Sequence, residues 1–372
     1  MDKPLPWYKV KNEGQLDSPS LLVFPDRVHT NIQHLLEIAG GQERLWPHVK
    51  THKMAEVARI HLELGISRFK CATLAEAEML GRAGAREVLV AHQLVGPKLG
   101  LFFQLKKAFP LTTFYALADD EAILRSLSRL AVSEQSVVPV FLDINNGMDR
   151  SGIAPDKAAI ALYHLIDVLD GLEPAGLHVY DGHFRHPDFA QRKKASDEAF
   201  EAVFKMVDRL EESRLAVPHI IAGGSPSFPV HAQRKRVALS PGTYVFWDAG
   251  YGEILPELPF LPAALIYTRI ISRPAPGIVC LDMGHKAIAP ENPLTHRIRF
   301  LDFPVEEFKG QSEEHLVLQV PAWSDTYVGQ GVYGIPWHIC PTVALHHQAY
   351  IIRGHQVEES WEVVARKRML TI

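Results

Sequence analysis

The stretch Trp46-Pro47-His48-Val49-Lys50-Thr51-His52-Lys53 brings two lysines and two histidines together within six residues. A lysine amine at the carboxyl end of a barrel strand can form a Schiff base with a carbonyl compound, provided that burial or neighbouring cations lower its pKa. A solvated basic loop contains the same residue types. The remaining motifs of the chain decide between these two interpretations.

Two glycine-containing stretches, Ile221–Ser227 and Pro241–Tyr244, follow neighbouring predicted strands. Residues without a side chain let backbone N–H groups approach an anion, and the hydroxyls of serine and threonine add donors. Each stretch alone also fits an ordinary turn. Together, at the ends of adjacent strands, they predict a phosphate cradle.

Two further stretches place polar side chains directly after predicted strands. Arg150 lies in Leu142–Gly152, where its guanidinium can hold a phenolate or a carboxylate, or pair with Asp149 at the surface. Tyr180–His186 combines one tyrosine with two histidines. A tyrosine ring can stack on an aromatic compound, and a histidine can act as a general base near neutral pH.

A possible metal pair lies near the end of the chain, in Pro336–Thr342. In an extended segment, residues i and i+2 point to the same face, so His338 and Cys340 can grip one metal ion. A buried cysteine beside a hydrogen-bonded histidine is the alternative. Ser312–His315 and Asp282–Lys286 are further polar clusters of the same region.

The elements that must position these residues change in character along the chain. Strands are predicted over 20–24, from about 45, and over 69–73, 88–91, 112–116, 137–144, 177–180 and 219–222, with helices such as 54–64, 74–83 and 97–108 between them. This alternation predicts a closed (β/α)8 TIM-type barrel, whose active site lies at the carboxyl ends of the strands. Beyond residue 245 the pattern is mainly β, with strands over 260–271, 278–281, 315–320 and 349–352.

We therefore predict an α/β chain of two domains, because 372 residues exceed the usual size of one hydrophobic core. Residues 1–19 form a lead-in packing on the β domain, 20–245 form the barrel, and 246–372 form the mainly β domain. A net charge of −4 excludes the basic footprint of a nucleic-acid or acidic-membrane binder. Three separated cysteines, and the lack of a signal pattern or an apolar run of 18 residues, predict a cytoplasmic protein.

In this order, the motifs resemble the D-threonine aldolase and D-serine dehydratase family, whose members are pyridoxal 5′-phosphate (PLP) enzymes of the alanine-racemase fold, type III. The resemblance covers nearly the whole chain. It runs through SLLVF, WPHVKTHK, ATLAEAE, NNGMDRSG, GLHVYDGH, AGGSPS, SPGTYVFWD, LDMGHKA, SEEH and IPWHICPTV.

The resemblance implies a role for each motif. Lys50 would hold the cofactor covalently, with Lys53 as the alternative, while His48 and His52 tune or pack around the site. The remaining cofactor contacts would come from Arg150 at the phenolic oxygen, Tyr180 against the ring, and Gly224, Ser225, Gly242 and Thr243 at the phosphate. His338 and Cys340 would bind a divalent metal at the substrate's β-hydroxyl, and His186 would remove the hydroxyl proton. The thiolate favours zinc, with manganese or magnesium as alternatives.

The implied activity is that of a PLP- and metal-dependent lyase on small β-hydroxy-D-amino acids, working as a homodimer. Retro-aldol cleavage to glycine and an aldehyde is the first expectation. Dehydration of D-serine or D-3-hydroxyaspartate is the second, because many aldolases of the family have HxD where this chain has HxC. An amino-acid racemase and a non-catalytic PLP-binding protein are further alternatives. Ser240 argues against racemisation, since alanine racemases place an arginine facing the pyridine nitrogen there.

Overall fold

The computed structural model describes residues 4–322 and 324–372. The chain forms two compact units. The barrel unit contains Leu35–Lys50, Val57–Gly242 and Lys367–Ile372, and the β unit contains the residues up to His34 together with Thr51–Glu56 and Thr243–Arg366. The chain passes from one unit to the other within the helices α1 (Pro25–Ala39) and α2 (Ala55–Glu63).

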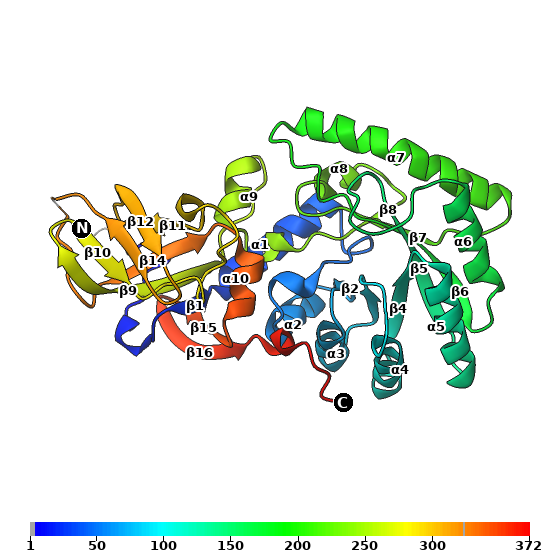
Figure 1. Ribbon diagram of the computed structural model, residues 1–372, viewed down its shortest axis with the longest axis horizontal. Coiled ribbons are helices and arrows are strands. Elements are labelled where there is room, and N and C mark those ends of the chain that lie inside the picture. Colours follow the sequence, from blue (N-terminus) through cyan, green and yellow to red (C-terminus); the bar gives the residue numbers. More distant parts are fainter. Residues whose placement is uncertain (1–3, 323) are drawn as a thin grey trace. The chain divides into compact units, whose positions relative to one another are not determined.

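The barrel unit is built on one parallel sheet whose strands follow each other in sequence order. Its strands are β2 (Arg68–Cys71), β3 (Glu87–Val90), β4 (Thr113–Ala118), β5 (Val138–Ile144), β6 (Leu172–Val179), β7 (His219–Ala222) and β8 (Val237–Leu239). The helices between them are α3 (Leu74–Ala83), α4 (Lys98–Ala108), α5 (Glu121–Ser133), α6 (Lys157–Val168), α7 (Phe189–Glu212) and α8 (Phe228–Ala232). Figure 1 shows α3 to α6 following one another along the outside of the sheet, as parallel crossovers require.

The motif around Lys50 joins the two edges of this sheet. Leu45 forms a parallel bridge with Leu239 of β8, and His48 forms one with Lys70 of β2. The N–H of Trp46 donates to Leu239 O at 2.8 Å, and the N–H of Lys70 donates to Pro47 O at 3.0 Å. Residues 45–48 therefore take the place of the eighth strand of the predicted barrel.

Apolar side chains fill the interior of this barrel. Trp46 is completely buried and packs with one residue from each strand from β3 to β8, namely Leu89, Leu117, Phe141, Ala175, Ile221 and Ala238. Burying these side chains stabilises the fold by about 1.5–3 kcal/mol for each large one. The carboxyl ends of the strands are thereby held at one edge of a rigid core.

The β unit contains the second sheet, in which the strands follow the order β12-β13-β10-β9-β1-β15-β16, while β14 also pairs with β9, and β11 pairs with β14. Their bounds are β1 (Ser20–Val23), β9 (Ala264–Ala275), β10 (Ile278–Leu281), β11 (Ile298–Leu301), β12 (Glu307–Gln311), β13 (Leu316–Gln319), β14 (Gly331–Pro336), β15 (Gln348–Arg353) and β16 (Gln356–Glu362). Two short helices, α9 (Ala249–Ile254) and α10 (Ile339–Leu345), belong to the same unit. A mainly β second domain was expected, and the structure has one.

One strand departs from the expected boundary at residue 20. β1 pairs in parallel with β15 and antiparallel with β9, so it belongs to the second sheet and not to the barrel. All four of its residues are buried, because it is a central strand with neighbours on both sides. The barrel itself begins with residues 45–48. Among the described residues, no helix combines the length and the apolar composition needed to cross a membrane.

Candidate active site

Lys50 lies directly after residues 45–48, which close the barrel, in the short 3-10 helix Val49–Thr51. Its side chain is half-buried, and its backbone N–H donates to Nδ1 of His48 at 3.2 Å. The amine therefore emerges at the carboxyl-end edge of the sheet, where barrel enzymes bind their ligands. His48 is buried and holds the turn that carries Lys50.

Three cations surround the ring of Tyr180, which follows β6. The Lys50 amine lies 5.7 Å from the ring centre, the Lys70 amine 5.4 Å, and the Arg150 guanidinium 4.4 Å. Each distance is within the range of a cation–π contact. The structure thus brings Lys50, Arg150 and Tyr180 together, as the sequence predicted, and adds Lys70.

Two glycines fix the position of the Tyr180 ring. A Cβ atom at Gly182 would lie 2.2 Å from the Tyr180 hydroxyl oxygen, and one at Gly224 would lie 3.3 Å from Cε2 of the ring. Both glycines therefore let bare backbone lie against the tyrosine. The ring is held between β6 and the loop that follows β7.

We expect Gly182→Ala to displace Tyr180 and to weaken PLP binding by about tenfold, because the added methyl group occupies the place of the hydroxyl. The matched control is Gly100→Ala on α4, where a new Cβ meets nothing within 4 Å. That control should bind PLP normally and be slightly more stable. Equal PLP affinities of the two variants, measured by fluorescence titration, would contradict this role of Gly182.

The loop after β7 is organised by a buried carboxylate. The Gly224 N–H donates to Ser227 Oγ at 3.1 Å, and Ser227 Oγ donates to Asp181 Oδ1 at 2.5 Å. His231 Nε2 lies 2.6 Å from the other oxygen, Oδ2. Burial alone would raise the pKa of Asp181, but His231 and the Ser227 hydroxyl lower it, so the group is a carboxylate that fixes this loop.

The predicted phosphate residues follow two adjacent strands. Gly224 and Ser225 follow β7, and Gly242 follows β8, which pairs with β7. Ser225 is buried, and the N–H of Gly224 is already used within its own loop. Thr243 belongs to the β unit, where its hydroxyl lies 3.5 Å from the Cys340 sulfur. A phosphate role for these four residues stays a prediction.

The loop after Tyr180 presents two histidines in different environments. His186 is exposed, and its Nδ1 accepts the Asp188 N–H at 3.0 Å, so a neutral ring carries its proton on Nε2. His183 is half-buried, and its Nδ1 is buried without a hydrogen-bond partner. Burial lowers the pKa of His183, which keeps this ring neutral. His183 is therefore a second candidate for the general base.

His338 and Cys340 lie where β14 gives way to α10. The expected extended segment is absent there, since His338 is the N-cap of α10 and Cys340 lies in the first turn of that helix. The two side chains still meet through a hydrogen bond. Burial lowers the pKa of His338, but Cys340 and Glu291 raise it more, to about 9. The predicted extended geometry was therefore wrong, and the metal-binding role of the pair stays a prediction.

The chemistry around this pair fits a soft divalent metal. His338 Nδ1 lies 2.6 Å from a Glu291 carboxylate oxygen, the arrangement that orients metal-binding imidazoles. The hydroxyls of Thr51 and Thr243 lie 3.1 Å and 3.5 Å from the Cys340 sulfur. No group of three or more metal-binding side chains occurs among the described residues, so two protein ligands would leave positions for substrate or water.

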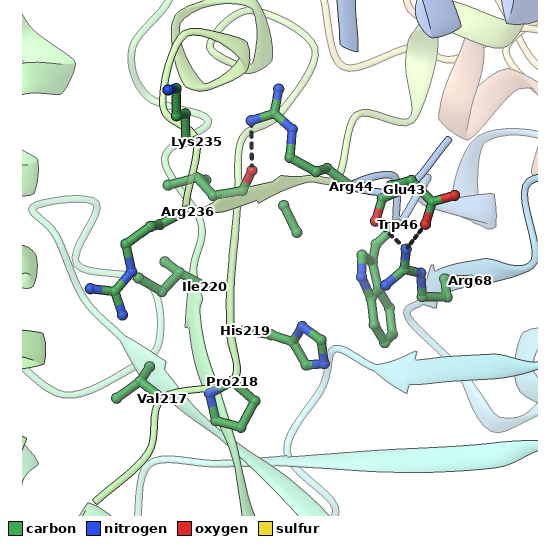
Figure 2. A pocket seen from close by; sticks show the side chains of 12 residues that line it. Glu43, Arg44, Trp46, Arg68, Val217, Pro218, His219, Ile220, Lys235 and Arg236 are labelled. Carbon is green, nitrogen blue, oxygen red and sulfur yellow. Dashed lines mark hydrogen bonds and ion pairs between the residues drawn. The ribbon is translucent and has the colours of Figure 1, made fainter. Parts of the chain in front are cut away.

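A pocket of about 350 Å³ lies at the other end of the barrel strands, where β2, β7 and β8 begin. Figure 2 shows Arg68 turned toward Glu43 there, and the two residues form an ion pair. The guanidinium of Arg44 donates to four backbone carbonyls. Arg68 and Arg44 are thus already engaged within the protein, and barrel enzymes place their active sites at the opposite, carboxyl ends of the strands. None of the predicted site residues lines this pocket.

The comparisons with known proteins agree with this architecture. Residues 23–249 match the alanine racemase N-terminal domain, and residues 263–352 match a putative serine dehydratase domain. A D-threonine aldolase from Arthrobacter is 28% identical over 95% of this chain and 93% of its own length. A 3-hydroxy-D-aspartate aldolase from Paracoccus denitrificans is 27% identical over the same shares.

Among solved structures, the D-threonine aldolase from Filomicrobium marinum superposes with a TM-score of 0.87 and 28% identity, over 95% of this chain and 96% of that protein. The family match spans more than half of the chain, and it includes Lys50 and Tyr180. The chain therefore belongs to the alanine racemase N-terminal-domain family, as a PLP-dependent enzyme of the lyase branch that adds a serine dehydratase-like domain.

Proposed function

We propose that the chain is a PLP- and divalent-metal-dependent lyase of β-hydroxy-D-amino acids that cleaves D-threonine-like substrates to glycine and an aldehyde. The observation that carries the proposal is the group of Lys50, Arg150 and Tyr180 at the carboxyl ends of the barrel strands. Two relatives that match over 95% of the chain, both named as aldolases, support the choice of reaction.

The residues present in the barrel unit fit PLP. The Tyr180 ring, which lies against Gly182 and Gly224, offers a flat apolar face for the pyridine ring. The amine of Lys50 suits an aldehyde, with which it can form a Schiff base, and the guanidinium of Arg150 suits a phenolate oxygen. When bound, PLP supplies the electron sink that makes cleavage next to an amino-bearing carbon feasible. Lys50 would hold the cofactor, Arg150 its phenolic oxygen, and the loops after β7 and β8 its phosphate.

The metal is proposed for His338 and Cys340, with zinc favoured by the thiolate. A bound metal supplies Lewis acidity at the substrate's β-oxygen. Thr51 and Thr243 would hold the Cys340 sulfur in place. Lys50 is joined by one peptide bond to Thr51, and Gly242 to Thr243.

A second candidate reaction is dehydration to a keto acid and ammonia. Cys340 in the HxC motif and the serine dehydratase-like match over 263–352 favour it. In that reaction Lys50 would take up the α-proton, whereas in the aldol cleavage a histidine takes up the hydroxyl proton.

Product analysis separates the two reactions. The holoenzyme is incubated with D-threonine, D-serine or D-3-hydroxyaspartate, and the products are identified by chromatography. We expect glycine and an aldehyde from D-threonine. Keto acid and ammonia would transfer the proposal to the dehydratase, and racemised substrate alone would refute both. We also propose a homodimer, which an active preparation eluting only as a monomer in gel filtration would contradict.

The base for the aldol cleavage is proposed to be His186, and paired variants test it. We expect His186→Asn to lower turnover of D-threonine about 100-fold, the usual contribution of a general base, with PLP affinity unchanged. His183→Asn should lower turnover by less than about tenfold. The reverse order of these effects would assign the role to His183, whose Nδ1 has no hydrogen-bond partner in the structure.

A further inference from the structure

Lys70 is a buried lysine of the barrel interior to which no role has been assigned above. It lies on β2 between the buried residues Phe69 and Cys71, and only 2% of it is exposed. Among the described residues, no carboxylate forms an ion pair with its amine. Instead, Nζ lies 2.6 Å from Ser240 Oγ and 3.4 Å from His178 Nε2. Because removing a lysine amine from water costs free energy, a lysine in such a position rarely serves packing alone.

Both partners of Lys70 are hydrogen-bond acceptors. Ser240 Oγ lies 3.0 Å from Gly223 O, to which its hydroxyl donates, so it accepts from Lys70. His178 Nδ1 lies 2.7 Å from Asp143 Oδ1 and donates to that carboxylate, which leaves the lone pair on Nε2 for Lys70. Two N–H groups of an ammonium are thereby used. The third N–H remains to be assigned.

The pKa of the Lys70 amine lies near neutral pH. Burial, together with the positive charges of Lys50 and Arg150, lowers its pKa to about 7, although the carboxylates Asp143 and Asp181 act in the opposite direction. Burial and the Lys70 charge also lower the pKa of His178, so the facing imidazole is neutral. A small gain of hydrogen bonding is then enough to keep the ammonium form.

The position of Lys70 matches one unassigned atom of the cofactor. The Lys70 amine lies 5.4 Å from the centre of the Tyr180 ring, and the Lys50 amine lies 5.7 Å from it. Under the proposed function, Lys50 binds the aldehyde, Arg150 the phenolic oxygen, and the loops after β7 and β8 the phosphate. The pyridine nitrogen is the remaining polar atom of PLP. Ser240, the partner of Lys70, precedes Gly242 of the predicted phosphate site by two residues.

We propose that the third N–H of Lys70 donates a hydrogen bond to the pyridine nitrogen of PLP, which makes Lys70 a second cofactor-binding lysine. The inference rests on the proposed function, because it needs PLP in this site. A ring nitrogen that accepts this bond keeps its lone pair, so Lys70 holds the proton at its own Nζ. Ser240 and His178 position the amine for that contact.

A cycle of one variant and one cofactor analogue tests the contact directly. The dissociation constants of PLP and of 1-deaza-PLP, in which carbon replaces the ring nitrogen, are measured for the wild type and for Lys70→Met. We expect the wild type to prefer PLP about tenfold, the usual effect of one hydrogen bond to a charged group, and Lys70→Met to bind both equally. A merely structural lysine would weaken both compounds alike and leave their ratio unchanged.

Two further variants keep the result interpretable. Lys70→Gln retains an N–H donor and should keep part of the preference for PLP. Lys106→Met on α4 removes another partly buried lysine, whose amine donates to Val137 O at 2.7 Å, and should keep the full tenfold ratio. Equal binding of both compounds by the wild type, or an unchanged ratio in Lys70→Met, overturns the Lys70 contact alone. A wild type that binds neither compound overturns the proposed function as well.

Discussion

Lys50→Ala should abolish the covalent attachment of PLP and lower turnover by about 1,000-fold or more. The reason is that this side chain is proposed both to anchor the cofactor and, in a dehydration, to move the α-proton. Lys70, the other amine near Tyr180, is held by Ser240 and His178 and does not replace it. The measurements are the visible absorbance of the reconstituted protein and the rate of product formation.

Lys53→Ala provides the comparison for this variant, because Lys53 follows Lys50 by three residues in the same motif. Lys53 has a positive φ of 54°, and alanine tolerates this conformation no worse than lysine, because both residues carry the Cβ atom that causes the strain. Absorbance and turnover should persist. Loss of both in Lys53→Ala, with both retained in Lys50→Ala, would move the anchor to Lys53.

Cys340→Ala should lower turnover at least about 100-fold and remove the bound metal, because losing even an outer-shell partner of a metal typically costs 10–100-fold. PLP binding should be preserved, since the predicted anchor Lys50 is unchanged. The bound metal is measured by elemental analysis, and turnover is measured before and after treatment with a chelator. Added zinc should restore the chelated wild type and not the variant.

Cys280→Ala is the matched control, because Cys280 is a buried cysteine of β10 in the same unit. It should lose some stability through its small cavity and keep both metal and turnover. Full activity of Cys340→Ala, or chelator-resistant activity of the wild type, would contradict the metal site. It would also favour the racemase or the non-catalytic PLP-binding protein.

Much of the fold follows from local sequence patterns. The helix predicted over 74–83 and the strands predicted over 219–222 and 278–281 have these bounds in the structure. Such elements have clear ends. For example, Thr73 caps the start of α3 by accepting the Glu76 N–H, and Gly84 ends it with a φ of 90°. Apolar runs between such ends predict parallel strands and hence the barrel.

Pairings between distant segments could not be predicted in this way. β1 looks like any short buried strand, and only its contacts with β9 and β15 place it in the second sheet. β14 contains two glycines, which weaken a strand pattern, although Gly331 and Gly334 lie against Tyr267 and Ile298, where a Cβ would collide. Sequence periodicity carries no information about these partners.

For the candidate site, too, local sequence patterns predicted some residues, whereas contacts between distant segments could not be predicted. Lys50, Arg150 and Tyr180 could be predicted to converge, because they follow strands of one parallel sheet. Lys70 was missed, although a lysine between Phe69 and Cys71 in an apolar strand is a signal for a buried function. Glu291 beside His338 and Asp181 beneath the β7 loop were missed as well, since their partners are 47 and 50 residues away.

The proposed role of Lys50 is tested most directly by locating the lysine that holds PLP in the wild type. The reconstituted protein is reduced with borohydride, digested and mapped by mass spectrometry. We expect a phosphopyridoxyl group on Lys50 and none on Lys53 or Lys70. A group on either of those lysines, or no modified lysine at all, would contradict this role.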